Sequence, residues 1–207
     1  EDSPTFRPKV AVVLNIGRNH LDRHGTFQKY IRAKEKIFSN QRQGDFTVLN
    51  YDDPVVRRMA RKTPANIVFF SRRPLVNGVY LKEGRIIANI RNQKRLLIHA
   101  DRFRLKGAHN IENILAAVAV AAILGIPQEK LQRSLDRFET LEHRIEPLGG
   151  CAGVQFVNDS KSTTVESTKA AFLSLSSPSV LIAGGRDKWV DFGGLEPLLR
   201  KHVKQVI

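Results

Sequence analysis

The sequence predicts an α/β protein, because short apolar runs that suit buried strands alternate with segments that carry helix signals. Three early apolar runs suit buried parallel strands: residues 9–16, 45–50 and 65–71. Helix signals lie between them, and a second alternation of the same kind begins at Val154. Two such sets in a chain of 207 residues favour two domains.

The elements of the first half follow from local signals. Thr26 can cap a helix that ends near Ser39, and Asp53-Pro54 begins a second helix that ends near Lys62. Beyond residue 77, two apolar runs flank Lys82-Glu83-Gly84 and predict a hairpin, since Gly supplies the positive φ of a tight turn. The strands expected here are residues 78–81, 85–90 and 94–99.

The second half begins with an alanine-rich helix over residues 111–124 that ends at Gly125, and Pro127 opens another helix that ends near Phe138. We expect these two helices to pack as a hairpin. Glu146 to Gly153 contains a proline and several glycines, so we predict a linker there. Alternating strands and helices are then expected at residues 154–157, 166–175, 180–183, 192–203 and from 205 onward.

Composition excludes several classes of protein. The chain is 42% hydrophobic, which suits a packed core, yet no apolar run approaches the roughly 18 residues of a membrane span. Cys151 is the single cysteine and no signal peptide opens the chain, so we expect a cytoplasmic protein without a disulfide. The net charge of +14 favours anionic partners, but the basic residues are scattered. We therefore predict a solvated basic surface, no nucleic-acid or membrane partner, and a monomer.

A polar segment at residues 158–164 follows the predicted strand that begins at Val154. It supplies the carboxylate of Asp159, the ammonium of Lys161, an amide and several hydroxyls. In open α/β sheets, ligands bind at the carboxyl ends of strands, so this segment is a candidate site. The alternative is a loop in which Asp159 and Ser160 only cap the following helix.

Several segments resemble the Mur ligase family when taken together: residues 15–38, 105–117, 141–146, 157–164 and 183–192. The pair His143-Arg144-Ile145-Glu146 and Asn158-Asp159-Ser160-Lys161 is most similar to the branch that adds D-glutamate to UDP-N-acetylmuramoyl-L-alanine. The resemblance implies the latter part of a central ATP-binding domain at residues 1–145. A partial Rossmann-like C-terminal domain, which binds the amino acid, would occupy residues 146–207.

The activity that the resemblance implies is ATP-driven amide synthesis with Mg²⁺. His20 matches a Mg²⁺ ligand, although a lone loop histidine is more often simply solvated. Lys34 matches the catalytic lysine that the family carbamylates to help hold a second Mg²⁺; its alternative is an ordinary helix-surface lysine. Asn19 departs from the family, which usually has aspartate there.

Nucleotide and amino-acid contacts are also implied by the resemblance. His109, Asn110 and Asn113 match the adenine-recognition segment, with helix capping as the alternative. Arg144 and Asp159 match contacts to ATP phosphate and ribose. The residues that match the D-glutamate carboxylate clamp are Lys161, Thr163 and Lys188, the last of which would otherwise be a turn lysine.

The Gly-rich phosphate loop of the family, Gly-x-x-x-x-Gly-Lys-Ser/Thr, does not occur in the sequence. We therefore expect a fragment of a longer ligase, with that loop encoded upstream, and no turnover by these residues alone. Two rival hypotheses remain. One is another member of the superfamily, such as a different Mur ligase or a folylpolyglutamate synthase-like ligase. The other is a noncatalytic basic module that binds anions.

Overall fold

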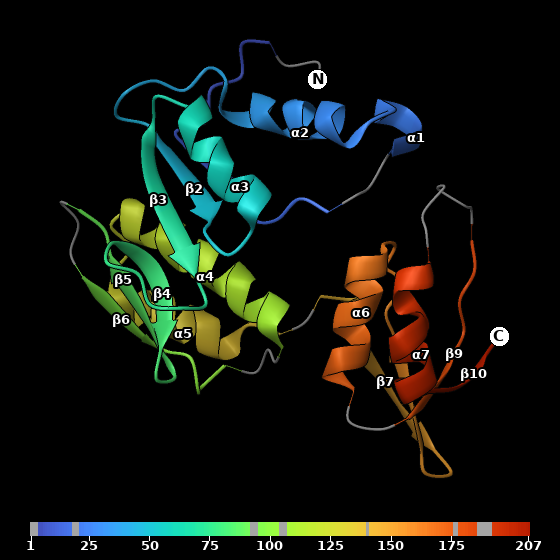
Figure 1. Ribbon diagram of the computed structural model, residues 1–207. Coiled ribbons are helices and arrows are strands. Elements are labelled where there is room, and N and C mark those ends of the chain that lie inside the picture. The colour runs from blue at the N-terminus through green and yellow to red at the C-terminus, as the bar shows by residue number, and fades with distance from the viewer. Residues whose placement is uncertain are drawn as a thin grey trace. The chain divides into compact units, whose positions relative to one another are not determined.

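A six-stranded mixed sheet, with its strands in sequence order, organises the larger part of the chain (Figure 1). The computed structural model describes residues 4–17, 21–91, 95–103, 107–139, 141–175, 178–185 and 192–207. The described residues of Glu1–Gly17 and Thr26–Phe138 form one compact unit, and those of Arg18–Gly25 and Glu139–Ile207 form a second. Each unit has its own sheets.

Four parallel strands open the sheet of the first unit: β1 (Val10–Val13), β2 (Phe46–Asn50), β3 (Asn66–Ser71) and β4 (Gly78–Lys82). Two antiparallel strands complete it: β5 (Arg85–Asn89) and β6 (Leu96–His99). The β4–β5 turn places Glu83 and Gly84 at φ of 49° and 71°, as a type I′ hairpin requires. The strands and hairpin predicted for the first half are confirmed.

Helices cover both faces of this sheet, and β2 shows why. Val48 and Leu49 are both fully buried, and neighbouring strand residues point to opposite faces. Leu49 packs with α2 (Phe27–Glu35), α3 (Pro54–Arg58) and the 3-10 turns that follow them, Lys36–Phe38 and Met59–Lys62. As predicted, Thr26 caps α2 by accepting the Lys29 N–H at 3.2 Å.

The other face of the sheet packs against α4 (Ala108–Ile123), and α5 (Gln128–Arg137) lies against β6. Val48, Phe70 and Ile86 of the strands join Leu115 and Val118 of α4 in one buried cluster. Leu124 is the C-cap of α4, and Gly125 follows it with φ of 69°, as the glycine after a helix end does. Over the described ranges, no helix has both the length and the apolar character needed to cross a bilayer.

The buried polar side chains of Gln41 and Asp45 hold the start of β2 against the chain before β1. The side chain of Gln41 donates to the carbonyls of Pro8 at 3.0 Å and Phe46 at 2.8 Å. Asp45 accepts Arg7 Nε and the Arg42 N–H, each at 2.8 Å. The Arg7 hydrogen bond, helped by the Arg42 N–H, lowers the pKa of Asp45 to about 2.

The second unit contains two separate two-stranded sheets among its described residues. β7 (Glu146–Cys151) and β8 (Val154–Asn158) are antiparallel, whereas β9 (Ser179–Leu181) and β10 (Val203–Val206) are parallel. Its helices are α1 (Leu21–His24), α6 (Val165–Ser174) and α7 (Glu196–His202), which a 3-10 turn at Gly193–Leu195 precedes. Thr164 caps α6 in a capping box with Ser167.

The predicted linker at Glu146 to Gly153 is wrong, because this segment is β7 and its turn. Ala152 and Gly153 take φ of 49° and 79° and close a tight hairpin onto β8. Pro147 is tolerated because β7 is an exposed edge strand, where a missing N–H need not break a ladder. The short hairpin connection pairs β8 with β7, and among the described residues β8 is not paired with β9 or β10, which form a separate parallel pair.

Candidate functional site

Two aspartates organise the carboxyl edge of the first sheet. Asp53 Oδ2 accepts the Ile16 N–H beyond β1 at 3.0 Å, while its Oδ1 caps α3 through the N–H groups of Val55 and Val56. Asp52 Oδ1 accepts the Ser71 hydroxyl and its Oδ2 the Arg72 N–H, each at 2.8 Å. These carboxylates therefore tie the ends of β1, β2 and β3 together.

An ion pair extends this edge to α4. Arg72 Nε lies 2.9 Å from Glu112 Oε1, and the Glu112 side chain is only 17% exposed. Burial raises the pKa of Glu112, the Arg72 charge opposes that rise, and the charges of Asp52 and Asp53 add to it. Sequence reasoning missed Asp52, Arg72 and Glu112; a glutamate in the largely apolar α4 was the available signal.

The start of α4 carries the three predicted adenine-recognition residues. His109 and Asn110 are half-buried and Asn113 is exposed. Asn110 and Asn113 are three residues apart and so share one side of the helix. Gly107 precedes the helix at φ of 95° without a side-chain cap, and a Cβ there would lie 3.0 Å from His109 Cε1. The alternative in which His109, Asn110 or Asn113 is the N-cap of this helix is wrong, since the N-cap is Gly107.

Of the residues predicted to hold Mg²⁺, the structure describes Lys34 but not His20. Lys34 is exposed in the last turn of α2, with Nζ 5.2 Å from the centroid of the Tyr30 ring. His20 and its neighbour Asn19 lie outside the described residues. In the part of the chain that the structure describes, no three His, Cys, Asp or Glu side chains gather to hold a metal ion.

Hydrogen bonds join the segment 143–146 to the segment 158–161 in the second unit. Asp159 Oδ1 accepts the Ile145 N–H at 3.1 Å, and the Lys161 N–H donates to the His143 carbonyl at 3.1 Å. Asn158 Nδ2 lies 2.8 Å from His143 Nδ1. Arg144 lies on the segment that leads into β7, and Asp159 and Lys161 lie on the segment that follows β8. Because β7 and β8 are paired, the structure brings these three residues onto two hydrogen-bonded segments.

Backbone strain flanks Arg144. His143 has φ of 64° and Ile145 has φ of 50°, and a β-branched residue rarely adopts this left-handed region. Such strain persists only where surrounding contacts hold it. Here the Asp159 carboxylate holds Ile145, and Glu146 Oε2 accepts the His143 N–H at 2.7 Å. The Arg144 side chain is exposed and available to a ligand.

The predicted D-glutamate residues lie on the loop before α6, apart from Lys188, which falls outside the described residues. Lys161 and Thr163 are both exposed, and the Thr163 N–H donates to the Lys161 carbonyl at 3.0 Å. The alternative in which Asp159 and Ser160 only cap the helix is wrong, because Thr164 is the cap. Lys161 therefore lies in an exposed turn before α6 that makes no side-chain cap to the helix.

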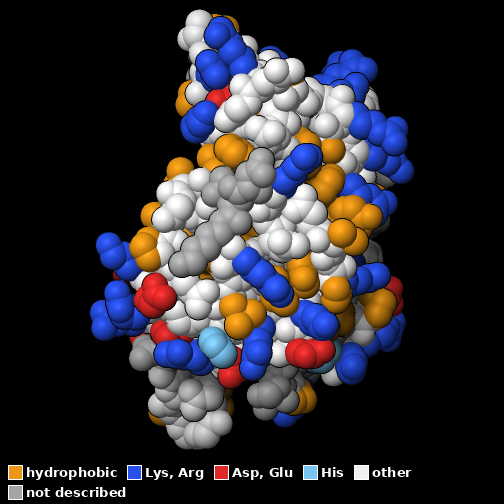
Figure 2. Space-filling view, turned by 90° about the vertical axis from the view of Figure 1, so that its left-hand side faces the viewer, with side chains coloured by type: hydrophobic (Ala, Val, Ile, Leu, Met, Phe, Trp, Pro, Cys, Tyr) orange, Lys and Arg blue, Asp and Glu red, His pale blue; other side chains and the backbone are white. Residues whose placement is uncertain are grey.

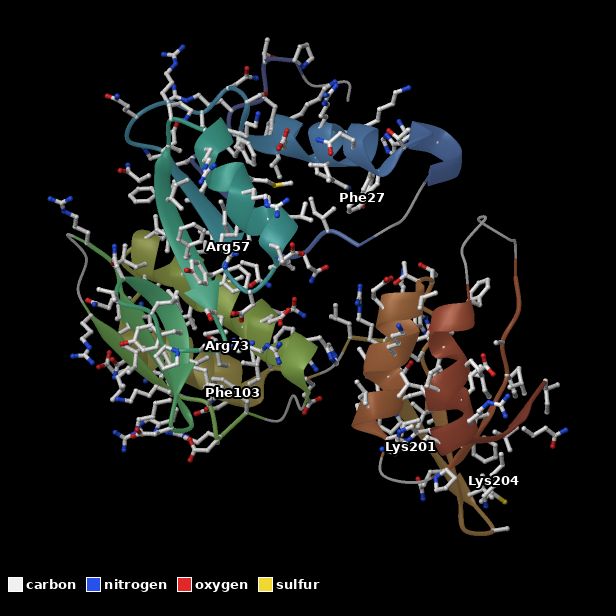
Figure 3. All side chains as sticks on the ribbon, viewed as in Figure 1. Phe27, Arg57, Arg73, Phe103, Lys201 and Lys204 are labelled. Carbon is white, nitrogen blue, oxygen red and sulfur yellow. The ribbon has the colours of Figure 1, made fainter. Side chains whose placement is uncertain are left out.

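Basic side chains are dispersed over the face of the molecule that Figure 2 shows. On the face in Figure 2, Lys and Arg side chains are spread among hydrophobic and uncharged ones. Some have local partners: the Arg57 guanidinium lies 4.9 Å from the Tyr51 ring centroid, and Arg102 pairs with Asp136 at 2.7 Å. Figure 3 shows Arg57 on α3 and Arg73 beyond the end of β3.

Comparison with known families identifies the larger unit. A family model described as the Mur ligase middle domain matches residues 2–121, which is more than half of the chain. The chain belongs to the Mur ligase family. Curated relatives of this Mur ligase chain are named "UDP-N-acetylmuramoylalanine--D-glutamate ligase". The protein from Pelotomaculum thermopropionicum is 42% identical over 208 residues, covering 100% of this chain and 46% of the relative. That from Clostridioides difficile is 43% identical with the same coverage.

Solved structures show the same fold. MurF from Acinetobacter baumannii has a TM-score of 0.69 and 19% identity, covering 97% of this chain and 51% of that one. MurF from Thermotoga maritima, solved in complex with ADP, also has a TM-score of 0.69 and 19% identity, over 97% of this chain and 53% of that one. The Mur ligase chain described here spans about half the length of the curated relatives it matches.

Proposed function

We propose that this chain contributes to an ATP-dependent ligase that joins D-glutamate to UDP-N-acetylmuramoyl-L-alanine in the synthesis of peptidoglycan precursors. The observation that carries the proposal is the 42–43% identity, along the whole chain, to relatives that bear this enzyme's name. Residues 1–145 would form the ATP-binding part and residues 146–207 the amino-acid-binding part. The proposed reaction passes through an acyl phosphate, which sets its products and the order of its steps.

In the proposed reaction, the substrate carboxylate attacks the γ-phosphorus of ATP, which gives ADP and an acyl phosphate. The amino nitrogen of D-glutamate then attacks the carbonyl carbon. A C–N bond forms, the C–O bond to phosphate breaks, phosphate leaves and the nitrogen loses a proton. Mg²⁺, held by His20 and carbamylated Lys34, would offset the charge of the phosphates.

The residue roles follow the chemistry of each side chain. Carboxamides pair a donor and an acceptor with the edge of adenine, which suits Asn110 and Asn113, with His109 beside them. Arg144 can bind phosphate through two parallel N–H groups, and Asp159 can accept from a ribose hydroxyl. The proposed D-glutamate carboxylate contacts are Lys161, Thr163 and Lys188.

The reaction is tested with the product of the complete reading frame that encodes this chain. We expect phosphate release that requires ATP, UDP-N-acetylmuramoyl-L-alanine and D-glutamate together. Stimulation by another amino acid, or by a folate with L-glutamate, would reject D-glutamate and favour a sister ligase. For residues 1–207 alone we expect no turnover, because they lack the Gly-rich phosphate loop; D-glutamate-dependent phosphate release by them would contradict this.

Lys161 is tested in the same complete protein. Lys161→Ala should raise the KM for D-glutamate at least tenfold and the KM for ATP less than twofold, because one carboxylate contact is lost. Lys201→Ala is the control, since Lys201 is an exposed lysine on α7 (Figure 3). Equal changes in both KM values would assign Lys161 a structural role.

Lys34 has its own test. If the carbamate forms there, Lys34→Ala should abolish turnover, and short carboxylates added to the assay should restore part of it. Lys36→Ala, a change of an exposed lysine two residues later, should leave the rate unchanged. Full activity of the Lys34→Ala protein would remove this residue from the catalytic machinery.

A further inference from the structure

The ion pair between Arg72 and Glu112 links the carboxyl edge of the first sheet to the start of α4. Arg72 Nε lies 2.9 Å from Glu112 Oε1. The Arg72 backbone is itself held, because its N–H donates to Asp52 Oδ2 at 2.8 Å. A continuous series of contacts therefore runs from the end of β2 through Arg72 and Glu112 to α4.

The partly buried position of Glu112 raises the pKa of its carboxyl, and Arg72 offsets part of that rise. The Glu112 side chain is 17% exposed, and the carboxylates of Asp52 and Asp53 act on it. A partly buried carboxylate near two others is costly to ionise without a cation. Arg72 supplies that cation at 2.9 Å, so the ion pair is the contact that holds the Glu112 side chain against the sheet edge.

The first turn of α4 has no side-chain cap to hold it. Gly107 is its N-cap and makes no side-chain bond, whereas α2, α3 and α6 are capped by Thr26, Asp53 and Thr164. Apolar packing of α4 becomes complete only further along, at Ile114, Leu115 and Val118. The contact of Glu112 with the sheet edge is thus one restraint on the helix between its start and its fully buried part.

Glu112 also lies between the residues that matter for the proposed nucleotide contact. It follows Asn110 by two positions and precedes Asn113 by one. Successive residues of a helix are rotated by about 100° around its axis. A contact that holds Glu112 in place therefore also sets the direction in which Asn110 and Asn113 point. Small rotations of that side would misalign paired carboxamide contacts with a planar base.

We infer that Arg72 and Glu112 are positioning residues for adenine recognition, whose ion pair orients the first turns of α4 so that Asn110 and Asn113 meet the base. This inference rests on the proposed function, since it needs ATP to bind at the start of α4. Neither Arg72 nor Glu112 contacts the nucleotide in this arrangement. Their effect passes through the orientation of the helix.

The test uses steady-state kinetics of the complete reading-frame product. Arg72→Ala and Glu112→Gln should each raise the KM for ATP about tenfold, with kcat and the KM for D-glutamate changed less than twofold. The double variant should match either single variant, because one interaction is removed in all three. Arg72→Lys should recover part of the loss, since it keeps the charge but not the Nε geometry.

Arg73→Ala is the matched control, because Arg73 is an exposed arginine next to Arg72 (Figure 3). It should leave the KM for ATP unchanged. Melting temperatures of all variants separate positioning from stability: a role in stability alone would lower Tm at an unchanged KM, which overturns the inference. Additive effects in the double variant, or an equal effect of Arg73→Ala, would overturn it too.

The inference and the proposed function fail in different ways. If the wild-type protein binds and uses ATP while the Arg72 and Glu112 variants keep its KM, only the positioning role is rejected. If the wild-type protein neither binds nor uses ATP, the proposed function is rejected, and the positioning role is rejected with it.

Discussion

The two units of this chain bury apolar side chains to different degrees. In the first, Leu49, Phe70 and Leu115 have no exposed surface and belong to clusters on both faces of the sheet. In the second, the buried apolar side chains among the described residues are Val165, Phe172 and Leu195. Hydrophobic burial stabilises by about 25 cal/mol per Å². The first unit therefore has a core of its own, whereas the described residues of the second bury few apolar side chains and are joined by polar contacts between loops.

This difference bears on where function resides. The proposed phosphate and amino-acid contacts of the second unit, Arg144 and Lys161, lie on loops held by hydrogen bonds, and strained residues flank Arg144. The proposed adenine contacts of the first unit begin a helix that is anchored in a full core. We expect the second unit to unfold first, and the following substitutions test that expectation.

The largest effect is expected from Phe172→Ala on α6, where the Phe172 side chain is 3% exposed. Large-to-small changes of a buried phenylalanine cost about 3–5 kcal/mol. A unit with few buried side chains cannot absorb that loss, so it should unfold while the first unit stays folded. Amide hydrogen exchange should show loss of protection in β7 to β10 with β1 to β6 unchanged.

Leu173→Ala is the control for this change, because Leu173 is adjacent and 70% exposed. It should leave the exchange of both units unchanged. Simultaneous loss of protection in β1 to β6 would show that the two units unfold together, and would remove the distinction between them.

Gly78→Ala is the corresponding test in the first unit. Gly78 has φ of +127°, and an added Cβ would collide with the carbonyl oxygen of Phe69. Strain and steric overlap together should cost about 3 kcal/mol, measured by urea denaturation. Gly84→Ala, at φ of +71° with no atom within 4 Å, should cost only about 1 kcal/mol. Equal costs would mean that β4 shifts to relieve the contact.

Helix caps offer a smaller comparison between the units. Asp53→Ala removes the α3 cap and also the acceptor of the Ile16 N–H, so we expect a loss of about 2 kcal/mol. Thr164→Ala removes the α6 cap alone and should cost about 1 kcal/mol. Thermal denaturation measures both. A larger loss for Thr164→Ala would indicate that α6 supports the loops before it.

The smallest expected effect is the loss of the stabilising contribution of Asp45 at acidic pH. The pKa of Asp45 is lowered from 3.8 to about 2 by Arg7 and the Arg42 N–H. Its ionised form therefore stabilises the first unit fully above the unfolded pKa, and this contribution is lost as the pH falls from 3.8 to about 2. The difference in urea midpoint between wild type and Asp45→Asn should shrink over that window. A difference that stays constant over that window would contradict this prediction.

Local patterns predicted most of the elements. Thr26 and Asp53 occur where their side chains cap the following helix, and Glu83-Gly84 where a tight turn joins two strands. Each of these signals acts within a few residues, so it can be recognised without knowing the fold. The strand β7 was missed because its glycines and proline resemble a linker, and only its pairing with β8 makes it a strand.

The candidate residues were found by motif, but their arrangement came from contacts between distant segments. The sequence by itself determined the alternation of strands and helices, the helix caps and the adjacency of Asp159 and Lys161. Only the tertiary structure decided that Asp53 holds Ile16, that Arg72 pairs with Glu112, and that Ile145 is held at positive φ. Local signals depend on near neighbours, whereas these contacts depend on how separate segments meet in the fold.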